Sequence, residues 1–364
     1  MESVYTGNRI EGSNPSLSAL WGAGRALTHG PLFIFMPPTF RVDAARARAL
    51  AGVLAAVQLR DEWFFPRARS FSGRLYEAEF VLAWVGICHR TQGLHAQVDG
   101  QLLHGSDALA HRLREVLDED PTRFSAESLA ALSATELSGW FRGQPAPLTR
   151  VDQRCALLND LGHWLQRECG GHLAGAITAA KGRLAGSRGL FARLARTQAY
   201  RDPVRKKTQL LLQTLRAMKL FEPADCEHLT LPIDNHIVRV FLRTGVLQPT
   251  NERAHELASG AACTAAEDLL LRTAALRASK PMATVALLGV LDPLLWMVGR
   301  NCCRADRAAV CSQQQAPCPH ETACSLRAAT GLDCGLQCPL QSVCASGGGG
   351  ADALLEPQHD TDLY

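Results

Sequence analysis

Apolar residues recur at three- and four-residue spacing through most of the chain, and this periodicity predicts helices. VDAARARALAGVLAAVQ (42–58) carries Asp43 at the position of an N-cap. AEFVLAWVGICHR (78–90) is apolar almost throughout, which is typical of a buried helix. The same spacing continues in PLTRVDQRCALLNDLGHWL (147–165), KKTQLLLQTLRAMKL (206–220) and ATVALLGVLDPLLWMVGR (283–300). Most of the chain is therefore expected to form amphipathic or buried helices.

The remaining local signals also favour helices over strands. Ser133 and Glu136 have the spacing of a capping box. Ala and Leu dominate the composition, β-branched residues are sparse and aromatic residues make up 6%. No alternating apolar and polar pattern indicates a strand. We predict an all-α fold.

Charge and hydropathy narrow the class of protein further. The formal net charge is +3, which gives no overall signal for binding a polyanion. No apolar run approaches the ~20 residues that cross a bilayer, and no secretory signal is evident. We expect a cytoplasmic protein with no membrane partner.

Composition also divides the chain into regions. Residues 1–30 are expected to be a spurious or disordered leader, because GSNPSLSA back-translates to a sequence resembling the T-arm and 3′ end of a transfer-RNA gene. A helical core is predicted over 31–300, followed by a cysteine-rich metal loop over 301–345. Glycine-rich residues 346–364 are expected to form a flexible tail.

LPIDNHIVRVFLRTG (231–245) is the segment most indicative of chemistry. Pro232 restricts the turn, Asp234 can cap the following helix, and Arg239 and Arg243 lie one turn apart on the same face. The plain interpretation is an N-cap followed by solvated arginines. The alternative is a carboxylate held at a helix N-terminus to stabilise a cationic transition state.

This segment resembles endonuclease III and its relatives, the helix-hairpin-helix DNA glycosylase superfamily. The functional aspartate of that superfamily begins a motif of the form D-x-H-I-x-R-V-x-x-R-T, whose fixed positions are filled here by Asp234, His236, Ile237, Arg239, Val240, Arg243 and Thr244. Upstream, Lys207 and Thr208 match the family's lysine segment. Downstream, the last core helix of the family is matched by Asp292, Trp296, Gly299 and Arg300. The resemblance implies a two-lobed helical fold with a cleft near 200–240.

A second resemblance covers more of the chain. Residues from about 75 to 300 are similar to the queuosine salvage proteins, which share the glycosylase core and cleave the N-glycosidic bond of a 7-deazaguanine nucleotide. In that family an aspartate precedes a K-x-x-Q helix, and Asp202, Lys206 and Gln209 match this pattern. The resemblance implies a modified nucleotide, free or in DNA, as substrate.

The two resemblances imply roles for individual residues. Asp234 would stabilise the oxocarbenium-like state that forms when the base leaves the sugar. Lys207 would either attack C1′ as a nucleophile or pair with a carboxylate or phosphate, and Asp202 would contact the base or supply a second carboxylate. Substrate-binding roles are implied for Lys206, Gln209, His236, Arg239 and Asp292.

Cysteine spacing predicts a metal centre after the last core helix. Of 13 cysteines, eight fall between Cys302 and Cys344, a pattern that indicates metal binding in a reducing compartment. The glycosylase loop has the form C-x6-C-x2-C-x5-C, and the favoured quartet here is Cys324, Cys334, Cys338 and Cys344. An alternative quartet is Cys303, Cys311, Cys318 and Cys324. A [4Fe–4S] cluster is expected, with zinc as the alternative.

Three functions follow as hypotheses. The first is an N-glycosidase acting on a modified purine or 7-deazaguanine, in a nucleotide or in DNA, with a role in DNA modification. The second is a DNA repair glycosylase with lyase activity through Lys207. The third is a protein that binds nucleosides or nucleic acid without catalysis.

Overall fold

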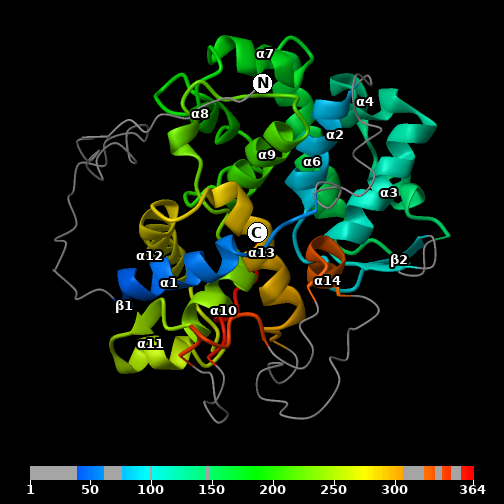
Figure 1. Ribbon diagram of the computed structural model, residues 1–364. Helices are drawn as coiled ribbons and strands as arrows, with labels where there is room; N and C mark the ends of the chain where they lie inside the picture. Colours follow the sequence, from blue (N-terminus) through cyan, green and yellow to red (C-terminus); the bar gives the residue numbers. More distant parts are fainter. Residues whose placement is uncertain are drawn as a thin grey trace. The chain divides into compact units, whose positions relative to one another are not determined.

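The computed structural model describes residues 39–60, 76–98, 101–143, 147–305, 324–332, 338–345 and 354–364. These residues are mostly helical, as the sequence predicts (Figure 1). Their buried apolar side chains form two hydrophobic cores. Residues 1–38, which include the expected leader, lie outside the described residues. Among the described residues, no helix combines the length and the apolar character that crossing a membrane requires.

The first core is built from the helices of the middle of the chain. They are α2 (Glu77–Ile87), α3 (Ser106–Glu119), η3 (Pro121–Phe124), α4 (Ala126–Ala131), α5 (Ala134–Trp140), α6 (Val151–Glu168), α7 (Leu173–Ala179), α8 (Leu190–Leu194) and α9 (Lys206–Ala217). The expected buried helix is α2, and all but one of its residues are buried. Tyr200 also belongs to this core and donates a hydrogen bond of 2.6 Å to the carbonyl of Leu82 in α2.

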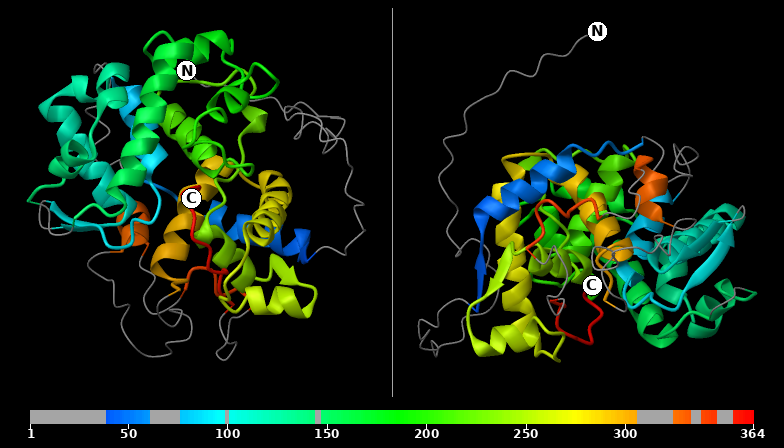
Figure 2. Two further views of the ribbon diagram at one scale, coloured as in Figure 1. Left: turned by 180° about the vertical axis from the view of Figure 1, so that it is seen from behind. Right: turned by 60° about the horizontal axis from the view of Figure 1, so that its bottom comes forward.

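The second core combines an early helix with the later part of the chain. It contains α1 (Ala44–Ala55), α10 (Asn235–Arg243), α11 (Glu252–Leu257), α12 (Ala265–Ala283), α13 (Leu288–Asn301) and α14 (Ser325–Thr330). Helix α1 packs against α12, as Figures 1 and 2 show from different sides. In the sequence, the short 3₁₀ helix η4 (Cys226–His228) lies between α9 and α10.

Two short antiparallel ladders add to the predicted helices. Strand β1 (Phe40–Val42) pairs with β4 (Leu247–Pro249), and Arg41 faces Gln248 in the register. Strand β2 (His95–Val98) pairs with β3 (Gln101–His104). With at most four residues each, these strands are too short to produce an alternating pattern that a sequence reader would trust.

Helix starts follow the polar residues that the sequence singled out. Asp43 Oδ1 accepts from the amides of Ala45 and Arg46 at 3.0 Å each, and so caps α1. Ser133 Oγ accepts from the amide of Glu136 at 3.1 Å and caps α5. Both caps satisfy amides that lack a partner in the first helical turn.

The close approach of α10 and α13 depends on one glycine. A Cβ at Gly299 would lie 2.8 Å from the Cβ and 2.9 Å from the carbonyl oxygen of His236. Only a residue without a side chain lets the two helix backbones come this near. Helix α9 approaches the same region, because it begins near one core and continues into the other. Val204, just before α9, belongs to the second core, and Leu211, within α9, belongs to the first core. The starts of α9 and α10 and one face of α13 therefore lie together at the junction of the cores.

Candidate active site

Asp234 occupies the N-cap of α10 and is held in a fixed orientation. The preceding turn is anchored by Leu231 and Ile233, which are fully buried in the second core. Asp234 has extended backbone angles, and its Oδ1 accepts from the amide of Ile237 at 2.9 Å. The residue is 7% exposed, so the carboxylate does not face bulk solvent. The N-cap is therefore real, and it places a nearly buried charge at the helix terminus.

Asp292 lies within electrostatic reach of both Asp234 and Lys206. Burial raises the pKa of Asp292, in α13, to about 8, and the charge of Asp234 adds to this rise. Lys206, at the start of α9, opposes it. At neutral pH Asp292 is therefore mostly protonated, so it can donate a proton or a hydrogen bond.

His236 stands next to these groups as a neutral ring. Burial lowers its pKa to about 4, although the charge of Asp234 works in the opposite direction. Its Nδ1 lies 2.9 Å from an amino group of Arg239, and its ring meets Trp296 edge to face with centroids 6.2 Å apart. These contacts fix the ring between α10 and α13. A neutral imidazole can accept or donate one hydrogen bond without adding charge.

Lys207 points away from this group. Its Nζ is fully buried and donates a 2.6 Å hydrogen bond to the carbonyl of Gly86 in α2. Burial lowers the pKa of Lys207 to about 7, and Lys206 lowers it further. Neither Asp234 nor Asp292 is among the main charges acting on it. Of the two adjacent lysines, Lys206 is therefore the one associated with the carboxyl pair.

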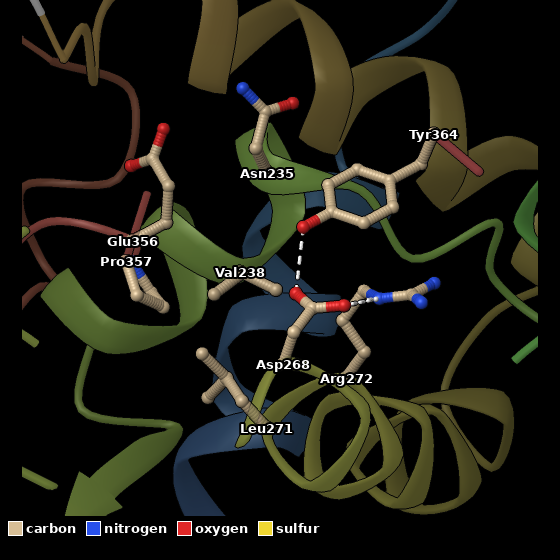
Figure 3. Close-up of a pocket in the computed structure, with 8 residues that line it drawn as sticks. All are labelled: Asn235, Val238, Asp268, Leu271, Arg272, Glu356, Pro357 and Tyr364. Carbon is tan, nitrogen blue, oxygen red and sulfur yellow. Dashed lines mark hydrogen bonds and ion pairs between the residues drawn. The ribbon is translucent and has the colours of Figure 1, made fainter. Parts of the chain in front are cut away.

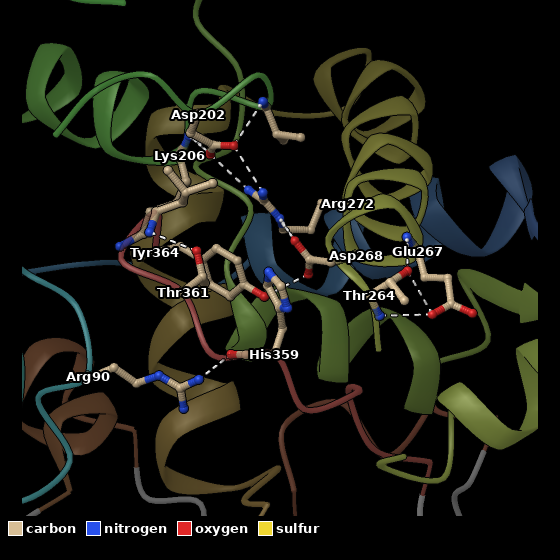
Figure 4. A network of polar contacts seen from close by, with 12 residues as sticks. Arg90, Asp202, Lys206, Thr264, Glu267, Asp268, Arg272, His359, Thr361 and Tyr364 are labelled. Atoms are coloured by element: carbon tan, nitrogen blue, oxygen red, sulfur yellow. Dashed lines mark hydrogen bonds and ion pairs between the residues drawn. The ribbon is translucent and has the colours of Figure 1, made fainter. Parts of the chain in front are cut away.

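Asp202 is occupied by a structural ion pair. Its two oxygens accept from both terminal nitrogens of Arg272, in α12, at 2.8 and 3.0 Å. They also accept from the amides of Val204 and Lys206, at 3.2 and 2.9 Å, at the start of α9 (Figure 4). With both oxygens committed, Asp202 positions α9 against α12 and leaves the role of second carboxylate to Asp292.

Arg272 is the centre of a network that the sequence did not reveal. Its Nε donates to Asp268 at 3.0 Å, and its guanidinium lies 4.4 Å from the centroid of the Tyr364 ring. Tyr364 Oη in turn donates to the other oxygen of Asp268 at 2.7 Å, as Figures 3 and 4 show. Only the Asp268–Arg272 spacing of four residues could have indicated part of this network.

Gln209 clamps the backbone that leads to Asp234. Its side-chain oxygen accepts from the amide of Thr230 at 3.0 Å, and its side-chain nitrogen donates to the carbonyl of His228 at 3.3 Å. Both side-chain groups of Gln209 are thus used within the protein. The residue fixes the 228–230 backbone rather than presenting an amide to a ligand.

The two arginines of the motif are buried, in contrast to the solvated face that the plain interpretation expected. Arg239, 2% exposed, donates to the carbonyls of Gly299 and Cys303, and to Glu356. Arg243 donates to the carbonyls of Leu354 and Arg304 at 2.9 and 3.0 Å. Arg239 therefore bonds to carbonyls at the end of α13 and just after it, and its guanidinium is not available for the substrate-binding role that we expected.

The cysteines are only partly described, and those described combine members of both expected quartets. Cys303 and Cys338 are buried in the second core and interact through their thiols, an interaction that lowers the pKa of Cys303 and raises that of Cys338. Cys344 Sγ lies 3.3 Å from the carbonyl of Arg243. The described residues contain no group of three or more potential metal-binding side chains. Outside the described residues lie Cys311, Cys318 and Cys334.

The residues after 353 differ from the expected flexible tail. We call 354–364 the acidic segment; residues 346–353 lie outside the described residues. The amides of Leu355 and Gln358 donate to the carbonyls of Ala258 and Ala261 at 2.7 and 2.9 Å. The segment, red in Figure 2, thus continues the packing of the second core.

A small cavity lies under the acidic segment, next to the start of α10. It has a volume of about 10 Å³, which is room for about one water molecule (Figure 3). Its lining is formed by Asn235, Val238, Asp268, Leu271, Arg272, Glu356, Pro357 and Tyr364. A purine base is many times larger than one water, so this space cannot accept a base while the segment occupies its present position.

Comparison with known proteins identifies no family: no protein-family model and no curated protein sequence matches this chain. The resemblance to the glycosylases remains an inference from the motifs.

Proposed function

We propose that this protein is an N-glycosidase that releases the base from a modified nucleotide. The observation that carries the proposal is the grouping of Asp234, Asp292 and Lys206 at the junction of the cores. This group combines a carboxylate at a helix N-terminus (Asp234), a carboxyl group that is mostly protonated at neutral pH (Asp292) and a cation (Lys206).

Each group fits a step of glycosidic bond cleavage. The carboxylate of Asp234 stabilises the positive charge that develops on the sugar as the bond to the base lengthens. The proton of Asp292 is available to the departing base, whose nitrogen gains electron density in the same step. Lys206 supplies a positive charge beside Asp292 that opposes part of the rise in the pKa of this carboxyl group.

The substrate expected from the motifs is a modified purine or 7-deazaguanine, free or in DNA. A panel of nucleotides and modified DNA, incubated with the protein and analysed by mass spectrometry for free bases, tests this. The decisive variant is Asp234→Asn, because asparagine caps a helix as well as aspartate but carries no charge. Base release should fall at least 100-fold.

Asp43→Asn is the matched control, since Asp43 caps α1 in the same way and lies outside the candidate site. It should leave base release unchanged. Unchanged release in Asp234→Asn would remove the carboxylate from the mechanism. Absence of release from every substrate in the panel would instead favour a binding protein without catalysis.

Lyase activity is the second candidate, with Lys206 in place of Lys207 as the proposed amine. An amine nucleophile must reach C1′, whereas the Nζ of Lys207 is buried against Gly86. Lys206 lies within electrostatic reach of the carboxyl group of Asp292. Borohydride trapping on DNA tests this: an adduct lost in Lys206→Ala and kept in Lys207→Ala supports the reassignment, and no adduct with the wild type refutes lyase activity.

We also propose that the cysteine region binds a [4Fe–4S] cluster, with zinc as the alternative. The pairing of Cys303 with Cys338, and the position of Cys344 against Arg243, favour a quartet of Cys303, Cys334, Cys338 and Cys344. Thiolates are the usual ligands of such clusters, which here would stabilise the fold. Absorbance near 400 nm after anaerobic purification should disappear in Cys303→Ser and persist in Cys169→Ser, a buried cysteine of the first core.

A further inference from the structure

Two arginines from separate parts of the first core converge on one carboxylate of the acidic segment. Arg90 follows α2, and Arg150 occupies the N-cap of α6. Their amino groups lie 3.4 and 2.8 Å from the same oxygen of Asp360. Arg90 also donates to the carbonyl of His359 (Figure 4). Two cations directed at one oxygen form an anion site, and the acidic segment fills it.

A third arginine extends this site along the segment. Arg201, which precedes α9, lies 3.5 Å from Asp362. The charge of Asp362 also offsets part of the lowering of the Lys207 pKa, so the segment reaches the start of α9. Arg90, Arg150 and Arg201 have no ion-pair partner outside the segment among the described residues. Without the segment, these three positive charges would have no acidic partner among the described residues.

The exposure of these groups distinguishes the site from a structural ion pair. Asp360 is 69% exposed, and the three arginine side chains are 34% to 54% exposed. Exposed pairs of this kind contribute little to stability. Arg90 and Arg150 nevertheless adopt left-handed φ angles of 47° and 52°, which are unfavourable for arginine. Such conformations concentrate at binding and catalytic sites.

The acidic segment itself has a half anchored by backbone hydrogen bonds and a half held by side-chain contacts, which include the bond of Tyr364 to Asp268. From Leu354 to Gln358 it bonds to backbone after α11, and Glu356 pairs with buried Arg239. From His359 onward its ion pairs are with Arg90, Arg150 and Arg201. The second half also places Tyr364 on the wall of the small cavity beside α10. The backbone hydrogen bonds that anchor the first half do not involve the second half.

We propose that Arg90, Arg150 and Arg201 form a phosphate-binding site for the substrate, and that Asp360 and Asp362 occupy it as a built-in competitor. Guanidinium groups bind carboxylates and phosphates with the same donors, so one can replace the other. Displacement of the second half by phosphate would also move Tyr364 and open the space beside Asp234. The identity of the ligand as a nucleotide rests on the proposed function.

The test replaces the competitor and leaves the arginines in place. In the full-length chain, Asp360→Asn/Asp362→Asn should bind phosphorylated ligands about three- to tenfold more tightly than the wild type, the range expected for removing a few exposed ion pairs. The probes are a fluorescent single-stranded oligonucleotide, guanosine 5′-monophosphate and guanosine. The gain for guanosine should be clearly smaller, because guanosine has no phosphate to occupy the arginines. The first two probes separate a nucleic acid strand from a free nucleotide.

Added Arg90→Ala/Arg150→Ala changes should abolish the gain, whereas Arg196→Ala, which removes an exposed arginine paired with Glu168, should not. Unchanged affinity of the Asn variant for both phosphorylated probes overturns the inference, as does an equal gain with guanosine. Base release is measured separately. Tighter binding without base release defeats the proposed function alone, and base release with unchanged binding defeats this inference alone.

Discussion

The protonation state of Asp292 gives the most direct physical test of the site, because it can be measured without knowing the substrate. The pKa of Asp292 is about 8 in the folded protein and near its ordinary value of 3.8 when the chain unfolds. Between these values the folded protein keeps a proton that the unfolded chain has lost. Raising the pH through this window therefore favours the unfolded chain.

The size of the effect follows from one proton. Each pH unit inside the window costs about 1.4 kcal/mol of unfolding free energy, so the change from pH 5 to pH 7 costs about 3 kcal/mol. Asp292→Asn keeps the shape of the side chain and cannot ionise. The unfolding free energy of Asp292→Asn, minus that of the wild type, should therefore increase by about 3 kcal/mol between pH 5 and pH 7.

Urea unfolding at pH 5, 6 and 7 measures this difference, since other titrating groups contribute almost equally to both proteins. Asp43→Asn is the control, because hydrogen bonds from the amides of α1 lower the pKa of Asp43 and its window lies below pH 4. A difference between Asp292→Asn and the wild type that stays constant with pH would show that Asp292 is ionised at neutrality and would refute its role as an acid.

Three further changes test the packing around the site by urea unfolding. Arg272→Met should cost about 3–5 kcal/mol, because it leaves the buried carboxylate of Asp202 without its cation; a loss below 1 kcal/mol would contradict the pair. Gly299→Ala should lower the unfolding free energy by about 1–3 kcal/mol, because the added Cβ forces α10 and α13 apart. The control is Gly52→Ala in α1, where a Cβ meets no other atom, and it should stabilise the protein by about 0.5–1 kcal/mol. Equal effects of the two substitutions would contradict the close approach of α10 to α13. Lys207→Met removes a lysine whose pKa is about 7 in the folded protein and 10.5 in the unfolded chain. Because the unfolded chain binds more protons between these values, the unfolding free energy of the wild type should rise relative to that of the variant from pH 7 to pH 9. Absence of this relative rise would show that the amine is not desolvated.

Local signals in the sequence predicted the elements of this fold well. The caps at Asp43, Ser133 and Asp234 each depend on residues within four positions, and all three are present. The buried character of α2 likewise followed from an apolar run. The pairing of β1 with β4 was missed, because it joins residues about 200 positions apart through strands of three residues.

The chemistry of the site was less accessible, because it depends on distant partners. The position of Asp234 was predicted from its helix, but the commitment of Asp202 depends on Arg272, which is 70 positions away. The elevated pKa of Asp292 arises from packing of α13 against α10, which no spacing in the sequence encodes. The burial of Arg239 arises in the same way, from carbonyls at the end of another helix.

The guanidinium of Arg239 has a consequence for how separate parts of the protein communicate. It holds the carbonyl of Cys303, where the cysteine region begins, and also the carboxylate of Glu356, which anchors the acidic segment. The same group touches the ring of His236, two residues after Asp234. A shift of the cysteine region would therefore change the contacts of one side chain that also holds Glu356 and His236.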